Sequence, residues 1–456
     1  MQKKRGLTVF ILFLTSICLV NASEYKEGEI IVKFKQQTSM SAVQKAFSLN
    51  AMSVKKSFKN FSVKIVKIAP GLTVERAIKN LRNDPDVEFA EPNYVRYLLD
   101  KLPDDPRFDE LWGLGKIDAH KAWDISTGSG NVVAAVIDTG VDYTHPDLKE
   151  NMWINKDEIP DNNIDDDGNG IVDDVYGYDA VTDDGSPMDN DGHGTHVSGT
   201  IGASGNNTIG VSGVNWNVKI MALKCDDEDG GLYVGAIINA IDYLIYMKEK
   251  GVNVKVVNGS FGGSHFSQAE YDAISKLKDN GILFIAAAGN DTKDHSSSHT
   301  YPSDFDLPNV ISVAATDSQD QLASFSDYGT VDVDLGAPGV DILSTVPGGY
   351  DVYRGTSMAA PHVVGISALV WGYRPELSYN AMKRILLTSG DAVSSLNGKT
   401  VTGKRVNAYN ALISPVPTNK PPSASIGNTR LKQMMGTPTL FDGSSSYDSD
   451  GEIVSY

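Results

Sequence analysis

Long apolar runs are scarce in this sequence, and none reaches the roughly 20 residues that a membrane-spanning helix needs. The run at the N-terminus covers residues 7–20 and follows three basic residues, Lys3, Lys4 and Arg5. A basic start followed by a short apolar stretch is typical of a signal peptide, and cleavage is predicted after Ala22. We therefore expect residues 1–22 to be removed and the mature protein to be secreted, with no membrane anchor.

Cysteine is nearly absent, with only Cys18 and Cys225 in 456 residues. Cys18 leaves with the signal peptide, which excludes an intramolecular disulfide in the mature chain. Lipid attachment at Cys18 is a weaker alternative, because bulky Ile17 precedes it. Cys225 follows the apolar run 220–223 and is expected to be a packed apolar side chain rather than a nucleophile. A secreted protein without disulfides needs another stabiliser, and bound metal is the usual one.

Positive charge is also in deficit, because 58 acidic residues face 40 basic ones and the formal net charge is −18. The deficit is uneven. Residues 24–100 carry 13 basic and 9 acidic side chains, whereas residues 101–456 carry 24 and 49. This balance argues against nucleic acid as a partner and favours docking of the basic N-terminal segment on the acidic remainder.

Between residues 24 and 99, the spacing of apolar residues predicts a small α+β unit of ferredoxin-like, βαββαβ order. Its strands are expected over residues 29–35, 61–65 and 87–90. One helix is expected over 43–49, and a second is indicated by the i, i+3, i+4, i+7 spacing of Val74, Ala77, Ile78 and Leu81.

Beyond a proline-containing stretch near residues 100–106, apolar strands alternate with helices as far as residue 413. This pattern predicts an α/β domain over 100–413 whose parallel sheet is covered by helices on both faces. Strands are expected over residues 132–137, 218–223, 254–257, 283–287 and 310–314, and helices over 233–250, 268–280 and 358–371. A Pro-rich linker over 414–422 follows, and the turn-rich residues 423–456 predict the incomplete start of a β-sandwich.

Three separate motifs carry candidate chemistry. Asp138 ends a predicted buried strand, whereas His193 and Ser357 each stand at a predicted helix start. A serine hydroxyl needs a base within reach, and that base needs an acceptor that fixes its tautomer; Ser357, His193 and Asp138 can fill these roles. Each motif taken alone has another explanation: the Asp138 motif could be only a turn, the His193 motif a metal-binding histidine pair, and the Ser357 motif a helix cap. The three together, at strand ends and helix starts, favour catalysis.

These motifs resemble those of the subtilisin-like serine proteases, the subtilase family: Asp138-Thr139-Gly140, His193-Gly194-Thr195-His196-Val197-Ser198-Gly199-Thr200 and Gly355-Thr356-Ser357-Met358-Ala359-Ala360-Pro361-His362. The resemblance covers residues 107–413. It implies a serine endopeptidase that acts through an acyl-enzyme, with His193 as the base and His196 as a packing residue. The segment 287–291 matches the family segment whose asparagine stabilises the oxyanion, which assigns a catalytic role to Asn290.

The resemblance also implies a binding site for an extended peptide. Its two walls match Gly230-Gly231-Leu232 and Ser260-Phe261-Gly262. The P1 side chain, on the N-terminal side of the cleaved bond, would be bordered by Phe261, Gly262, Gly289 and Thr300, none of which is charged. This predicts a broad or apolar P1 preference. Asp291 at the rim leaves open the alternative of a dedicated processing protease that cleaves after basic residues.

An acidic insertion between Asp138 and His193 predicts a calcium site. Asp165, Asp167, Asn169, Ile171 and Asp173 have the alternate spacing of a calcium loop, and Asp174 follows directly. No flanking helices are evident, so this is not an EF-hand, and a solvated acidic loop is the alternative. Similar insertions bind calcium in subtilases.

A second calcium loop is implied by the resemblance of residues 205–211 to a loop of the family. Carried over position by position, its ligands are the side chains of Asn207 and Asp147 and the backbone oxygens of Gly205, Ile209 and Val211. Asp105 is expected to complete the site.

The N-terminal unit, residues 24–99, resembles the subtilase inhibitory propeptide in Asp84-Pro85-Asp86-Val87 and Glu91-Pro92-Asn93-Tyr94. This implies a precursor whose propeptide assists folding, covers the cleft and is cut by Ser357 between Tyr97 and Asp104. Residues 441–456 resemble the opening of a PKD-type domain. We expect a monomer that acts on polypeptides; the alternative from another class is an inactive, calcium-stabilised binding or adhesion module.

Overall fold

The computed structural model describes residues 25–94, 101–227 and 230–415. The chain divides into two compact units, Met1–Leu99 and Asp100–Tyr456. The predicted signal peptide, most of the linker, the start of the β-sandwich and much of the predicted cleavage region lie outside the described residues. Among the residues described, every helix is too short or too polar to span a bilayer.

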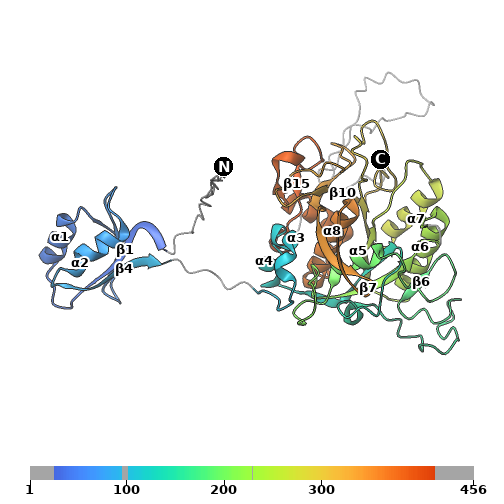
Figure 1. The fold of residues 1–456 in the computed structure, drawn as a ribbon, viewed down its shortest axis with the longest axis horizontal. Helices are drawn as coiled ribbons and strands as arrows, with labels where there is room; N and C mark the ends of the chain where they lie inside the picture. The colour runs from blue at the N-terminus through green and yellow to red at the C-terminus, as the bar shows by residue number, and fades with distance from the viewer. Residues whose placement is uncertain (1–24, 95–100, 228–229, 416–456) are drawn as a thin grey trace, which may run out of the picture. The chain divides into compact units, whose positions relative to one another are not determined.

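The first unit is a four-stranded antiparallel sheet with two helices (Figure 1). The order of its strands in space is β2-β3-β1-β4. Its elements along the chain are β1 (Tyr25–Phe34), α1 (Met40–Leu49), β2 (Ser53–Phe58), β3 (Val63–Lys67), α2 (Val74–Arg82) and β4 (Val87–Tyr94). The predicted βαββαβ order is confirmed.

The core of this unit follows from the two periodicities in its sequence. Alternate residues of β1 are buried, Ile30, Val32 and Phe34 among them, and the predicted face of α2 is buried along its whole length. The sequence analysis gave no range for the strand that is β2, because its side chains are mostly polar and nearly all exposed. Its position comes from backbone pairing with β3, which leaves no apolar pattern in the sequence.

The second unit is built on a nine-stranded sheet of order β14-β15-β11-β10-β9-β8-β5-β7-β6, parallel except for the short edge strand β14. The strands of this sheet are β5 (Gly128–Asp138), β6 (Gly177–Asp179), β7 (Asn217–Lys224), β8 (Val254–Gly259), β9 (Leu283–Ala287), β10 (Val310–Thr316), β11 (Leu335–Pro338), β14 (Asp391–Ala392) and β15 (Lys404–Arg405). A separate hairpin consists of β12 (Ile342–Val346) and β13 (Gly349–Tyr353).

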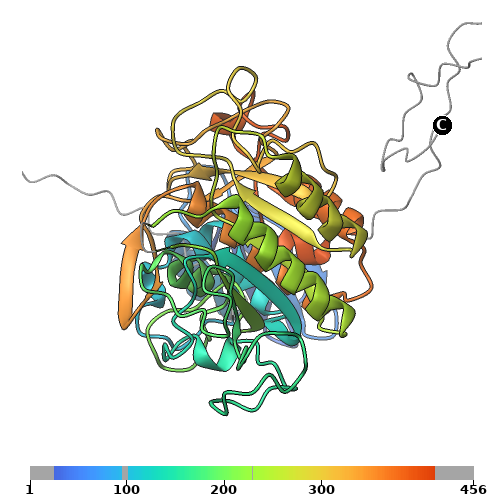
Figure 2. The ribbon, with the colours of Figure 1, turned by 90° about the vertical axis from the view of Figure 1, so that its right-hand side faces the viewer.

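Helices cover both faces of this sheet (Figures 1 and 2). They are α3 (Trp112–Lys116), α4 (Ala119–Trp123), α5 (His193–Gly202), α6 (Val234–Glu249), α7 (Gln268–Asp279), α8 (Thr356–Tyr373), α9 (Tyr379–Ser389) and α10 (Ala408–Ile413). All five strands and all three helices predicted in this unit are present. The predicted α/β architecture, a parallel sheet covered by helices on both faces, is therefore confirmed.

The alternation of side chains along β5 explains the two layers. Val132, Ala134 and Val136 belong to a core shared with α5 and α8, whereas Val133, Ala135 and Ile137 belong to a core shared with α6 and α7. A strand that is buried on both faces has no polar alternation, which is typical of a parallel sheet. Cys225 is fully buried in the second of these cores, as expected for a packed side chain.

Candidate active site

Asp138 and His193 meet at the C-terminal end of β5. Asp138 is the last residue of the strand, and its Oδ1 lies 2.7 Å from Nδ1 of His193, the first residue of α5. The close approach needs a glycine at position 194, because a Cβ there would lie 2.1 Å from Gly140 O. The start of α5 thus packs directly against the end of β5, and Gly194 makes room for this contact.

The charge of Asp138 controls the protonation of His193. Burial disfavours the imidazolium form, but the charge and hydrogen bond of Asp138, together with Asp191 and Asp189, outweigh burial and raise the pKa of His193 to about 9. The other histidine of this motif behaves differently: His196 is fully buried, bonds to Ile342 O at 2.9 Å, and burial lowers its pKa to about 4.

Ser357 is the second residue of α8, at the positive end of the helix dipole. Its hydroxyl donates to Ser260 O at 3.2 Å, and the Ser260 hydroxyl donates back to Ser357 O at 2.9 Å. Within the described residues there is no hydrogen bond between Ser357 and His193. Ser260 directly follows β8 and Ser357 lies in the first turn of α8, so this pair joins the C-terminal end of a strand to the helix.

Asn290 is tied to the same helix start. It follows β9, and its Oδ1 accepts the backbone N–H of Thr356 at 2.8 Å and the Thr356 hydroxyl at 3.0 Å. The carboxamide oxygen is therefore occupied, and Nδ2 is the donor that remains for a substrate. Gly289 N–H donates to the same hydroxyl at 3.1 Å.

A cleft of about 410 Å³ joins Ser357 and Asn290 to five of the predicted substrate-binding residues, Ser260, Phe261, Gly262, Gly289 and Thr300. It is also lined by three charged residues, Asp291, Lys293 and Asp327. From sequence, only Asp291 was expected near the P1 pocket. Lys293 Nζ lies 2.6 Å from Asp291 Oδ2. The four residues expected to border the P1 side chain are uncharged, but other residues that line the same cleft carry charges.

The other predicted wall lies outside this cleft. Gly230 borders a separate pocket of about 520 Å³ that also includes Asp191, two residues before His193. Leu232 pairs with Asp226 in an isolated antiparallel bridge, and Gly231 O accepts the N–H of Asp227 at 3.2 Å. Residues 230–232 are not among the residues that line the 410 Å³ cleft, and their role as its second wall stays a prediction.

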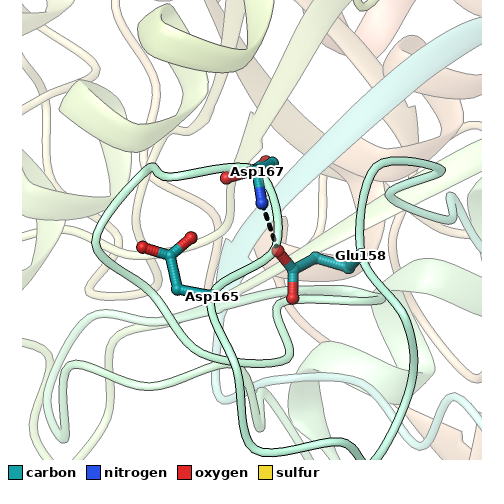
Figure 3. Close-up of side chains that lie close together, drawn as sticks. All are labelled: Glu158, Asp165 and Asp167. Carbon is teal, nitrogen blue, oxygen red and sulfur yellow. Dashed lines mark hydrogen bonds between the residues drawn. The ribbon is translucent and has the colours of Figure 1, made fainter.

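The acidic insertion brings three carboxylates together (Figure 3). Oxygens of Glu158, Asp165 and Asp167 lie within 4.8 Å of one another. Glu158 was missed by the sequence analysis because it precedes the loop by seven residues and has no place in the alternate spacing. Its Oε1 accepts the N–H groups of Asp166 and Asp167 at 2.9 and 3.1 Å.

The remaining residues of the predicted loop make other contacts. Asp173 accepts the N–H groups of Asn162 and Asn163, and Ile171 N–H donates to Asn169 Oδ1. Asp174 is fully buried and bonds to the side chains of Asn155, Asn169 and Tyr243. Burial raises the pKa of Asp174 to about 6.

The second predicted loop is also assembled. Asp105 accepts the N–H of Asn207 at 2.9 Å, and Asp147 accepts both Asn207 Nδ2 and the N–H of Val211 at 2.9 Å. Both carboxylates are buried. Ile209 N–H donates to Asn207 Oδ1 at 2.8 Å. Gly205 packs against Trp216, where a Cβ would lie 2.3 Å from the ring.

The architecture of the second unit has a counterpart among known proteins. A model of the subtilase family matches residues 129–411. The chain belongs to the subtilase family. A second match, to the fervidolysin N-terminal prodomain, covers residues 19–93. This subtilase is therefore a serine endopeptidase made as a precursor with a prodomain.

Relatives of this subtilase agree with that assignment. It is 37% identical to a thermophilic serine proteinase of Bacillus sp. strain AK1 over 85% of this chain and 88% of the relative. A protease from Pseudoalteromonas arctica superposes with a TM-score of 0.57 and 28% identity, over 68% of this chain and 99% of that one. Fervidolysin from Fervidobacterium pennivorans, a keratinolytic enzyme related to subtilisin, gives a TM-score of 0.55 and 27% identity, over 88% and 63%. Nothing in these comparisons favours the inactive binding module.

Proposed function

We propose that Asp138, His193 and Ser357 are the catalytic triad of this subtilase and that Asn290 stabilises the oxyanion. The observation that carries this proposal is the 2.7 Å contact between Asp138 Oδ1 and His193 Nδ1. With Nδ1 engaged by the carboxylate, the imidazole offers Nε2 as the base.

The reaction requires Ser357 to change its hydrogen-bond partner. Its hydroxyl leaves Ser260 O and gives its proton to His193 Nε2 while Oγ attacks the carbonyl carbon of the substrate. The oxyanion accepts hydrogen bonds from Asn290 Nδ2 and from the Ser357 backbone N–H. His193 then protonates the leaving amine, and an ester between the substrate and Ser357 remains. Water hydrolyses this ester through the same base.

The raised pKa of His193 leads us to expect that kcat/KM depends on pH. Only the neutral imidazole accepts the proton of Ser357, so kcat/KM should rise with pH up to about 9, the pKa of His193. Asp191→Asn removes a charge that favours the imidazolium, and the rising limb should shift to lower pH. The exposed Asp109→Asn is the control and should leave the limb in place. A limb that stays unmoved in Asp191→Asn would contradict this account of the His193 pKa.

We also propose that the enzyme has a broad or apolar P1 preference. Support comes from the pairing of charges in the cleft: Lys293 pairs with Asp291, and Asp327 faces a buried histidine, His295, at 3.5 Å. Neither carboxylate is an unpaired partner for a basic P1 side chain. Burial of an apolar side chain stabilises by about 25 cal/mol per Å², whereas a buried unpaired cation is costly.

A peptide library tests this preference. Large apolar P1 residues should have the highest kcat/KM, and Asp291→Asn should leave the ranking unchanged. Lys293→Gln frees Asp291 from its ion pair and should raise cleavage after arginine and lysine relative to the parent enzyme. If basic P1 residues dominate in the parent enzyme and Asp291→Asn removes that preference, the enzyme is instead a processing protease.

We further propose that calcium binds at both loops. All donor atoms are oxygens, as calcium prefers, and the buried carboxylates fit a cation. Glu158, Asp165 and Asp167 would hold one ion, with Asn169, Ile171, Asp173 and Asp174 as the surrounding loop. Asp105, Asp147, Asn207 and the backbone oxygens of Gly205, Ile209 and Val211 would hold the other. Bound calcium would neutralise these carboxylates and stabilise the fold.

The remaining proposals concern the precursor. We propose that the basic prodomain covers the cleft and that Ser357 of the same molecule cuts it away. The N-terminal apolar run supports export as a secreted enzyme, and the match to a prodomain supports action on polypeptides. We propose that the mature enzyme is a monomer.

A further inference from the structure

Asp327 holds the chain on both sides of Asn290. Its Oδ1 accepts the N–H of Asp291 at 2.9 Å and the N–H of Lys293 at 2.7 Å. Its own backbone N–H donates to Gly289 O at 2.9 Å. The residue before Asn290 and the segment after it are therefore both fixed to Asp327, which lies 34 to 38 positions further along the chain.

A buried histidine fixes Asp327 in turn. Asp327 Oδ2 lies 3.5 Å from His295 Nε2, and His295 Nδ1 lies 2.5 Å from Asp304 Oδ1. The side chain of His295 is 0% exposed and each carboxylate is 1% exposed. Burial opposes a charged imidazole, but the two nearby carboxylates, Asp304 and Asp327, outweigh it and raise the pKa of His295 to about 9. Near neutral pH this cluster is therefore an imidazolium between two carboxylates.

The cleft wall is shaped around the same carboxylate. Gly289 has φ +123°, and a Cβ there would lie 2.2 Å from Asp327 Oδ2. Only glycine fits this conformation and this contact. Asp327 itself lines the cleft together with Gly289 and Asn290. One buried side chain thus contacts both the wall of the cleft and the segment that carries the oxyanion donor.

We propose that Asp327, held by His295, is a positioning residue for Asn290 in the hydrolysis reaction. It does not touch the reacting atoms. It fixes the backbone on both sides of Asn290, while Thr356 fixes the Asn290 carboxamide oxygen, so that Nδ2 is already oriented when the oxyanion forms. This inference rests on the proposed role of Asn290.

The proposal predicts a loss of kcat that depends on Asn290. Asp327→Ala should lower kcat by about 10- to 100-fold, part of what loss of an oxyanion donor costs, with KM changed less than about twofold. Asp327→Asn keeps an acceptor oxygen for the two N–H groups and should lose less. In an Asn290→Ala background, Asp327→Ala should have little further effect on kcat, because the group that it positions is already gone.

The experiment measures kcat and KM of a double-mutant cycle on chromogenic peptides with apolar and basic P1 residues. The variant precursors are expressed in full and matured with immobilised wild-type enzyme, which is then removed. Asp334→Ala is the matched control: this carboxylate also accepts a backbone N–H, that of Ser312 at 2.9 Å, but makes no hydrogen bond to residues 289–293 within the described chain. Its kcat should stay near the wild-type value.

Each outcome separates this inference from the proposed function. If Asp327→Ala lowers kcat equally with and without Asn290, Asp327 is merely structural and the inference fails. If it lowers cleavage only after basic P1 residues, Asp327 binds substrate directly and the inference also fails. If Asn290→Ala leaves kcat unchanged, the oxyanion assignment itself is wrong. Should Asp327→Ala not fold, the same cycle with His295→Gln decides, and an effect of His295→Gln that persists in the Asn290→Ala background overturns the inference.

Discussion

Replacement of Ser357 by alanine is expected to abolish turnover and to trap the full precursor. Loss of the nucleophile in this type of triad costs on the order of 10⁴-fold or more in kcat, because the acyl-enzyme no longer forms. The proposed removal of the prodomain uses the same nucleophile, so residues 24–99 should remain covalently attached. Intact mass after expression in a host deficient in proteases measures both effects.

The control for this experiment is Ser318→Ala, which changes an exposed serine in a turn. It should mature and turn over as the parent does. Normal maturation of Ser357→Ala would show that another protease cuts the precursor, whereas an active Ser357→Ala enzyme would remove Ser357 from the mechanism altogether. Addition of wild-type enzyme to the trapped precursor should release the prodomain if the cut can also be made between molecules.

Removal of calcium is expected to cause the second large effect. If residues 1–22 are removed as proposed, Cys225 is the remaining cysteine and no intramolecular disulfide can stabilise the chain. Buried carboxylates lie at both loops. Binding to the folded form alone stabilises by RT ln(1 + [L]/Kd), about 2.7 kcal/mol at a hundredfold excess over Kd. The melting temperature should therefore fall by roughly 5 °C or more in chelator. The measurement uses enzyme blocked with a serine-directed inhibitor, so that self-digestion does not contribute.

Matched variants assign the calcium effect to a loop. Glu158→Gln and Asp147→Asn each remove one proposed ligand, from the first and second loop respectively, and each should reduce the calcium-dependent rise in melting temperature. Asp157→Asn changes an exposed carboxylate next to Glu158 and should retain the full rise. A melting temperature indifferent to chelator and to added calcium would refute both proposed sites.

The elements that the sequence predicts well are those whose pattern is local. Val132 to Ile137 are all apolar because β5 is buried on both faces, and the buried residues of α2 recur at helical spacing. Asp138, His193 and Ser357 are candidates from sequence for the same reason: each stands in a short motif that ends a strand or starts a helix. The structure adds the geometry that the motifs alone do not give: Asp138 Oδ1 lies 2.7 Å from His193 Nδ1.

What the sequence did not predict depends on contacts that no motif or periodicity encodes. Asp327 stands after a phenylalanine and a serine in a stretch with no motif. Its proposed role as a positioning residue for Asn290 is inferred from its hydrogen bonds to Asp291 and Lys293. Glu158 joins Asp165 and Asp167 because the chain folds back on itself, which periodicity does not show. Lys293 pairs with Asp291 across one residue of a loop, so the apparently free charge at the rim is compensated.

The proposed mechanism depends on Ser357 as the nucleophile and on His193 as the base that activates it. Its most direct test is the reaction of the mature enzyme with a fluorophosphonate inhibitor, followed by mass spectrometry of the digested protein. One adduct is expected, on Ser357, and its rate of formation should fall by orders of magnitude in His193→Ala. An adduct on another residue, or labelling of Ser357 at an unchanged rate without His193, would contradict it.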